Sequence, residues 1–261
     1  MALSNVQNVL PDGKNILVTG GYGYLGSSIS LALAQYGANV FVLARDKDKF
    51  DTTFESAFSK NIYFYETDIS QESSVISTYK LIKNDFGKID ALINNAFYIR
   101  GNNPLEMSLA DFNYTLEGTL SSVFLAIKNI IPYISKNGTI INVSSMYGMV
   151  APDFSAYDQS PQFLNPPHYG AAKAGVIQLS KYYASLLGKE GITVNTVTPG
   201  PFPSEIVQEN PTFIEELKKR TLLNKIGSPE ELAGIFVFLC SDAAKYITGQ
   251  NFVIDGGWTA K

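Results

Sequence analysis

The chain has 261 residues, of which 45% are hydrophobic and 17% are charged, a composition typical of a folded globular protein rather than a disordered or collagen-like one. Its 20 lysines and arginines and 24 acidic residues give a net charge of −4, so no general electrostatic attraction to nucleic acid or to an anionic membrane is expected. With one cysteine, Cys240, and one histidine, His168, the chain has no means to form an internal disulfide, and we expect no metal site.

The length fits one α/β domain that spans residues 1–261. The first 15 residues lack the continuous apolar stretch of a secretory signal, and no run of 18 apolar residues occurs in the sequence. We therefore expect a cytoplasmic protein without a membrane-spanning helix.

Short β-branched runs alternate with longer helical patterns along the chain. The strands are predicted at Asn15–Thr19, Asn39–Leu43, Asn61–Tyr65, Ile89–Ile93, Thr139–Val143, Ile192–Val197 and Phe252–Ile254. The helices are predicted at 25–36, 72–86, 109–133, 169–187 and 230–239, the last with a capping box of Ser228 and Glu231.

Because the strand runs are apolar on both faces and alternate with helices, they predict a Rossmann-type doubly wound parallel sheet with helices on both faces. Residues 151–167 and 199–211 show no regular pattern. Long irregular loops in a compact domain are usually functional, so we expect an inserted active-site loop at about 151–167 and a substrate loop at about 199–225.

A glycine-rich loop separates the first strand from the first helix. Glycines allow a tight turn and a close approach to a pyrophosphate, which the helix N-terminus then holds. The alternative is a tight turn that binds no ligand. The candidate cofactor-binding residues of this loop are Gly20, Tyr22, Gly23, Tyr24, Leu25 and Gly26.

The end of the second strand bears on the choice between NAD and NADP. An acidic residue at this position usually binds the ribose 2′-hydroxyl of NAD, whereas a nearby arginine favours the 2′-phosphate of NADP. Ala44 and Arg45 occupy the strand end, so we expect NADP. The alternative is that Asp46 reaches the ribose and Arg45 stays solvated, which would favour NAD.

Tyr169 and Lys173 share one helix face, because they are four positions apart in a predicted helix. A nearby cation stabilises a phenolate, so Lys173 is expected to lower the pKa of Tyr169 and make it a general acid and base. Ser145 follows the fifth strand, where ligands bind in open α/β sheets, and is placed to donate a hydrogen bond to a substrate oxygen. The alternative for Ser145 is simple turn chemistry.

Together these residues resemble the short-chain dehydrogenase/reductase family, over nearly the whole chain and in the family's order. The resemblance implies that Tyr169 transfers a proton, that Lys173 holds the nicotinamide ribose and that Ser145 polarises the carbonyl group. It also implies a homodimer or homotetramer. The further cofactor contacts that it implies are Asp68, Ile69, Asn95, Ala96, Pro199 and Gly200.

The chain departs from the usual family pattern at several positions. Tyr24 stands where the middle glycine of the loop is common, and Phe97 follows Asn-Asn-Ala in place of a glycine, where it is expected to narrow the site. Thr119 falls where the family has a helical asparagine that supports a proton-relay water. Ser145 and Tyr169 are 24 positions apart, a longer separation than is usual, which indicates the insertion.

The insertion resembles a subset of the family associated with bacterial sugar and surface-glycan pathways. It offers polar side chains next to the tyrosine, as a hydroxyl-rich substrate requires; the alternative is a surface insertion without a substrate role. The residues predicted to contact substrate are Phe97, Tyr147, Asp153 and His168.

We therefore predict an oxidoreductase that prefers NADP and transfers hydride between nicotinamide and a secondary alcohol or ketone, of a sugar or sugar phosphate. Two alternatives stay open. One is a nucleotide-sugar epimerase or dehydratase that retains its cofactor, and the other is a non-catalytic cofactor-binding protein with the same fold.

Overall fold

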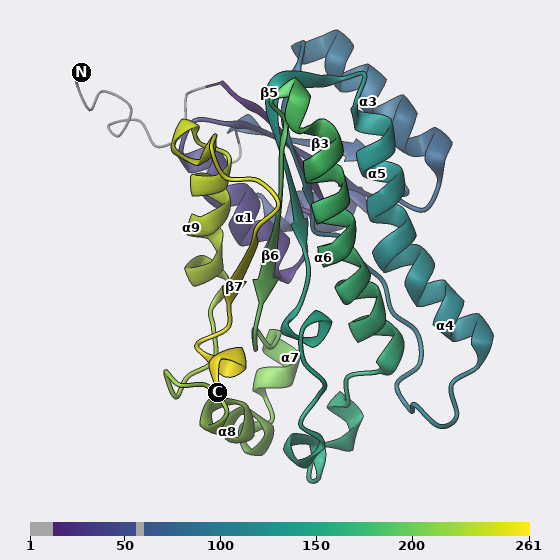
Figure 1. Ribbon diagram of the computed structural model, residues 1–261, viewed down its shortest axis with the longest axis vertical. Helices are drawn as coiled ribbons and strands as arrows, with labels where there is room; N and C mark the ends of the chain where they lie inside the picture. Colours follow the sequence, from purple (N-terminus) through teal and green to yellow (C-terminus); the bar gives the residue numbers. More distant parts are fainter. Residues whose placement is uncertain (1–12, 56–59) are drawn as a thin grey trace.

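The computed structural model describes residues 13–55 and 60–261, and its strands form one seven-stranded sheet in which every pairing is parallel (Figure 1). The strand order is β3-β2-β1-β4-β5-β6-β7, which reverses direction between β1 and β4. This order confirms the predicted doubly wound sheet. The strands are β1 (Asn15–Thr19), β2 (Asn39–Ala44), β3 (Ile62–Glu66), β4 (Ile89–Asn94), β5 (Ile134–Val143), β6 (Thr193–Pro199) and β7 (Asn251–Ile254).

Helices cover both faces of the sheet (Figure 1). One face carries α1 (Tyr24–Gln35), α2 (Lys47–Thr53) and α9 (Pro229–Leu239). The other carries α3 (Glu72–Phe86), α5 (Ser122–Ile130) and α6 (Pro167–Leu187). The predicted capping box at the start of α9 is present.

Each strand supplies both cores, since successive side chains point to opposite faces. In β1, Ile16 and Val18 pack with α1 and α9, while Leu17 packs with α3, α5 and α6. All three are fully buried, which explains why the strand reads as one continuous apolar run.

The helix predicted over 109–133 is interrupted. It consists of α4 (Leu109–Leu116), a π-helical turn (Glu117–Ser121) and α5, and it ends at Ile130, two residues before Pro132. A Cβ on Gly118 would lie 2.1 Å from the ring of Tyr98, so this turn accommodates a side chain from the loop after β4. Hydrophobic periodicity does not report such a packing contact.

The two irregular segments contain short helices that the sequence pattern did not predict. Two 3₁₀ turns, Phe154–Tyr157 and Pro161–Phe163, lie in the insertion. The segment after β6 forms α7 (Glu205–Gln208) and α8 (Pro211–Lys219). Asn210 caps α8 by accepting a hydrogen bond from the backbone of Phe213 at 2.9 Å.

Across the described ranges, no helix has the length and apolar character needed to cross a membrane. Residues 1–12, which include most of the stretch expected to lack a secretory signal, lie outside the described residues.

Candidate active site

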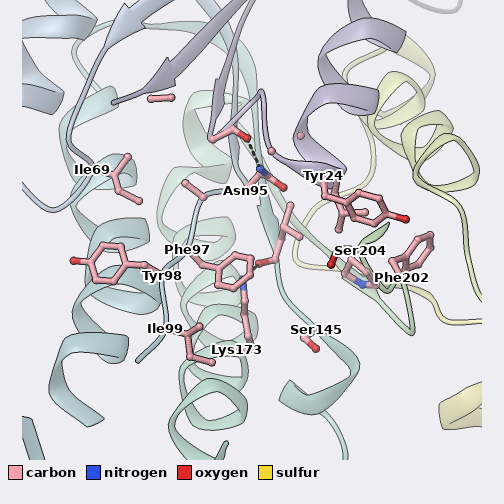
Figure 2. A pocket seen from close by; sticks show the side chains of 18 of the residues that line it. Tyr24, Ile69, Asn95, Phe97, Tyr98, Ile99, Ser145, Lys173, Phe202 and Ser204 are labelled. Carbon is pink, nitrogen blue, oxygen red and sulfur yellow. Dashed lines mark hydrogen bonds between the residues drawn. The ribbon is translucent and has the colours of Figure 1, made fainter. Parts of the chain in front are cut away.

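A cavity of about 640 Å³ opens at the carboxyl ends of the parallel strands, at the point where the strand order reverses (Figure 2). It brings together glycine-loop residues, residues that follow β2 to β6 and two side chains of α6. All fifteen predicted cofactor-binding residues line it: Gly20, Tyr22, Gly23, Tyr24, Leu25, Gly26, Arg45, Asp68, Ile69, Asn95, Ala96, Tyr169, Lys173, Pro199 and Gly200.

The glycine loop folds tightly enough that side chains are excluded from it. Gly20 has a φ of +62°, a conformation that glycine adopts without strain. A Cβ on Gly26 would lie 2.2 Å from the carbonyl oxygen of Gly20. Helix α1 begins at Tyr24 without a side-chain cap, and its first three residues line the cavity. These uncapped N–H groups and the helix dipole fit a pyrophosphate.

Hydrogen bonds hold the glycine loop against the segment after β4. The Asn95 Nδ2 atom donates to the carbonyl oxygens of Thr19 and Gly20, each at 3.1 Å. Figure 2 draws one hydrogen bond of Asn95 as a dashed line. The Thr19 hydroxyl in turn accepts from the backbone N–H groups of Asn95 and Ala96, each at 3.0 Å. Asn95 is therefore positioned to shape the wall of the cavity rather than only to contact a cofactor.

Arg45 and Asp46 take different roles at the end of β2. Arg45 is exposed and lines the cavity. Asp46 caps α2, where its Oδ1 accepts from the backbone N–H of Lys49 at 3.0 Å, and this bond lowers the pKa of its carboxyl group. Because the carboxylate is committed to the helix, the geometry favours Arg45 over Asp46 as the group that faces the adenosine ribose.

The residues of the predicted triad meet at the other end of the cavity. Ser145 follows β5, while Tyr169 and Lys173 lie in the first two turns of α6. The Lys173 ammonium is buried and donates to the carbonyl oxygen of Val143 at 2.7 Å. The Ser144 hydroxyl donates to the carbonyl oxygen of Lys173 at 2.8 Å, which ties α6 to the end of β5.

Burial is the main cause of the pKa shifts of Tyr169 and Lys173. It raises the pKa of Tyr169 to about 12, with the nearby Ser145 hydroxyl acting in the opposite direction. It lowers the pKa of Lys173 to about 7. The pKa of Tyr169 is thus raised rather than lowered as expected, because burial disfavours the phenolate.

Phe97 occupies the reactive end of the cavity, where the family pattern has a glycine. Its half-exposed ring lies 5.6 Å from the Tyr169 ring and 5.1 Å from Lys173 Nζ. Figure 2 shows Phe97 beside Lys173. Among the four residues predicted to contact substrate, Phe97 alone lines the cavity.

The other three predicted substrate contacts do not line the cavity. Tyr147 lies 2.5 Å, hydroxyl to hydroxyl, from Tyr157, and Asp153 pairs with Arg220 on the surface. His168 is fully buried with its Nε2 atom 2.7 Å from the carbonyl oxygen of Arg100. At His168, sequence proximity to Tyr169 was misleading, since successive residues of α6 point in different directions. Tyr147 and Asp153 lie outside α6, and their side chains contact Tyr157 and Arg220 instead.

Thr119 does not line the cavity either. Its buried hydroxyl donates to the carbonyl oxygen of Tyr98 at 3.1 Å. This bond helps to fix the loop after β4 and engages the hydroxyl that would otherwise bind a relay water.

Sequence reasoning missed several residues of the cavity wall. Tyr24 also has an unpredicted role, because its hydroxyl accepts from Gln208 Nε2 at 3.1 Å and so links the glycine loop to α7. A cue existed for some wall residues, since they follow Pro199-Gly200 closely in the chain. The missed side chains include Tyr98 and Ile99. Asn165 was expected among the polar side chains of the insertion, and the expected substrate loop contains Phe202, Ser204 and Val207, none of which was singled out.

Comparisons with known proteins agree with this architecture. A family model described as "Enoyl-(Acyl carrier protein) reductase" matches residues 24–259. The 3-oxoacyl-[acyl-carrier-protein] reductase FabG of Staphylococcus aureus is 34% identical over 94% of this chain and 97% of its own length, and that of Thermotoga maritima is 32% identical over 94% and 98%.

Solved structures show the same likeness. A short-chain dehydrogenase/reductase from Serratia marcescens has a TM-score of 0.85 and 28% identity, and covers 95% of this chain and 98% of its own. One from Mycobacterium marinum has a TM-score of 0.86 and 28% identity over 99% and 100%.

The parallel sheet, the dinucleotide-type loop and the serine, tyrosine and lysine of one cavity define an oxidoreductase that acts on a ketone or secondary alcohol. The chain belongs to the short-chain dehydrogenase/reductase family. The comparisons give no support to the predicted subset of sugar and surface-glycan enzymes.

Proposed function

We propose that this protein is an NADPH-dependent ketoreductase that converts a ketone into a secondary alcohol. The observation that carries the proposal is the presence of Ser145, Tyr169 and Lys173 in the same cavity as the uncapped N-terminus of α1. The glycine loop and α1 would hold the pyrophosphate of the cofactor, and Arg45 would hold the 2′-phosphate.

The side chains suit the proton half of such a reaction, in which bound NADPH supplies the hydride. Ser145, which lines the same cavity, would donate a hydrogen bond to the ketone oxygen. A pKa of about 12 keeps Tyr169 protonated at neutral pH, so its hydroxyl has a proton to give to the same oxygen. The ammonium of Lys173 lies near enough to stabilise the phenolate that remains, 5.7 Å from the centre of the tyrosine ring.

The substrate class that we propose is a 3-oxoacyl thioester or a similar acyl ketone. The FabG relatives are named for 3-oxoacyl substrates. The apolar ring of Phe97 lies beside Tyr169 and Lys173, and Ile99 and Phe202 also line the cavity. A sugar hydroxyl that faces these apolar side chains would lack a hydrogen-bond partner, which costs roughly 1–3 kcal/mol for each such group.

The test is oxidation of NADPH, followed by absorbance, with acetoacetyl-CoA, a 2-enoyl thioester and a set of ketose sugars. We expect turnover of the 3-oxoacyl thioester. Replacement Tyr169→Phe should lower kcat by about 10²–10⁴-fold because it removes the proton donor, while the dissociation constant of NADPH stays nearly unchanged. Tyr182→Phe, at an exposed position of α6, is the matched control.

Three results would contradict the proposal. Full activity of Tyr169→Phe would remove that tyrosine from the mechanism. An altered substrate with no net change in reduced cofactor would favour the epimerase or dehydratase alternative. Tight binding of NADPH without turnover of any ketone would favour a non-catalytic cofactor-binding protein.

A further inference from the structure

A small apolar core lies beside the catalytic cavity, separate from the two cores that cover the sheet. We call it the outer core. The ring of Phe213 in α8 lies 4.9 Å from the ring of Phe163 and 5.5 Å from that of Tyr157, both in the insertion. The insertion and α8 therefore pack as one unit. The buried members of the outer core are Met146, Ala156, Tyr157, Phe213, Ile214, Leu217 and Trp258.

Arg220, just after α8, connects the same two segments at the edge of the outer core. Its Nε donates to Asp153 Oδ2 at 2.7 Å, and one terminal nitrogen donates to the Ser155 hydroxyl at 2.6 Å. The other terminal nitrogen donates to Glu216 Oε2 in α8 at 2.7 Å. Only 16% of the Arg220 side chain is exposed, whereas 52% of the Asp153 side chain is, so the guanidinium is largely shielded while the Asp153 end of the contact is open to solvent.

The insertion is in turn linked to the catalytic serine. The hydroxyl of Tyr157 lies 2.5 Å from that of Tyr147. The backbone N–H of Tyr147 donates to the Ser145 hydroxyl at 3.2 Å. Asn165 of the insertion and Val207, which packs on the outer core, both line the catalytic cavity. The position of the insertion thus determines part of the wall that a substrate meets.

We infer that Arg220 is a positioning residue, which fastens the insertion to α8 and so pre-forms the substrate side of the cavity. This inference rests on the proposed function. Neither the insertion nor α8 belongs to the sheet. Without the hydrogen bonds of the Arg220 guanidinium, their relative position would depend on the apolar contacts of the outer core. Binding of a substrate would then include the entropic cost of ordering the wall.

The test compares Arg220→Met with Lys218→Met, both in the holoenzyme with NADPH. Lys218 is the matched control, because its salt bridge to Glu215 at 2.6 Å stays within α8. We expect Arg220→Met to raise the KM of the ketone about tenfold, with kcat and the dissociation constant of NADPH within about twofold. Asp153→Asn should raise KM in the same direction and add little to Arg220→Met, since both act on one contact. Lys218→Met should leave all three constants unchanged.

Hydrogen exchange of backbone amides provides a readout that does not depend on turnover. Arg220→Met should speed exchange about tenfold in 153–163 and 211–219 and leave the sheet protected. If the natural protein reduces no ketone, the proposed function fails, and exchange alone then decides whether Arg220 fastens the two segments. Unchanged exchange, an unchanged KM in an active enzyme, or equal effects of Lys218→Met would each overturn the inference.

Discussion

At the scale of single residues, the adjacent side chains of Arg45 and Asp46 have different roles because they have different contacts. Asp46 caps α2, and its carboxylate is engaged by the backbone of Lys49, whereas Arg45 lines the cavity. A cation at this place attracts a 2′-phosphate, and a carboxylate would repel it. The expected preference for NADP therefore depends on one side chain and is testable at one position.

Replacing Arg45→Ser should weaken the binding of NADPH by about tenfold to a hundredfold, since a charge-assisted pair contributes roughly 1.5–3 kcal/mol. Binding of NADH, which has no 2′-phosphate, should change little. Titration of each cofactor, followed by intrinsic fluorescence, measures both dissociation constants. Lys80→Ser, at an exposed position of α3, serves as the control. Equal weakening of both cofactors would assign Arg45 a general structural role instead.

Whether a residue of α6 lines the cavity depends on the direction of its side chain as well as on its chemical type. Tyr169 and Lys173 were predicted because four positions along a helix bring side chains to one face, and both line the cavity. His168 precedes Tyr169 directly, yet it is fully buried against the loop after β4. Its neighbourhood in the sequence gave no information about the side of α6 to which it points.

At the scale of elements, the π-helical turn between α4 and α5 is the clearest departure from the sequence pattern. Gly118 in this turn faces the ring of Tyr98, and the Ser122 hydroxyl donates to the Gly118 carbonyl oxygen at 2.9 Å. The turn lets the loop after β4 pack closely against the helix, and that loop supplies Phe97 and Tyr98 to the cavity.

Gly118→Ala should lower the free energy of unfolding by roughly 1–3 kcal/mol, because its Cβ would overlap the Tyr98 ring. Gly234→Ala in α9 is the matched control, since nothing lies within 4 Å of the Cβ that it adds. This control should instead gain about 0.5–1 kcal/mol, because alanine favours a helix interior over glycine. Urea denaturation of the two variants checks the opposite signs, and equal stability of Gly118→Ala and the natural protein would contradict the packing account.

At the scale of the whole molecule, the buried Lys173 is expected to make the free energy of unfolding depend on pH. Burial lowers the pKa of Lys173 from its ordinary value of 10.5 to about 7 in the folded protein. Between these values the unfolded chain binds more protons, so this residue makes the free energy of unfolding rise as the pH rises from 7 toward 10. Tyr169 acts oppositely, but only above its ordinary value of 10.

The variant Lys173→Met should remove the contribution of this lysine to the pH dependence. Relative to the variant, the natural protein should gain on the order of 1–3 kcal/mol in unfolding free energy between pH 6.5 and 9. Urea denaturation at both pH values measures the difference. Lys181→Met, at an exposed position of α6, should keep the pH dependence of the natural protein. Parallel curves for Lys173→Met and the natural protein would show that burial does not shift the titration of Lys173.

The sequence by itself determined the sheet, the glycine loop and the pairing of Tyr169 with Lys173 on one helix face, because their signals are local. The apolar run within Asn15–Thr19 indicates a buried strand whichever strands it pairs with, and the glycines follow it directly. Tyr169 and Lys173 are four positions apart, which is about one turn of α6.

Only the tertiary structure decided how the loops meet. Asp153 and Arg220 are 67 positions apart, and Tyr98 reaches Gly118 from another segment. These contacts depend on how two irregular segments pack against each other, and no periodicity within either segment encodes that distance or direction. The raised pKa of Tyr169 also depends on the tertiary structure, since it results from burial of the side chain in the folded protein.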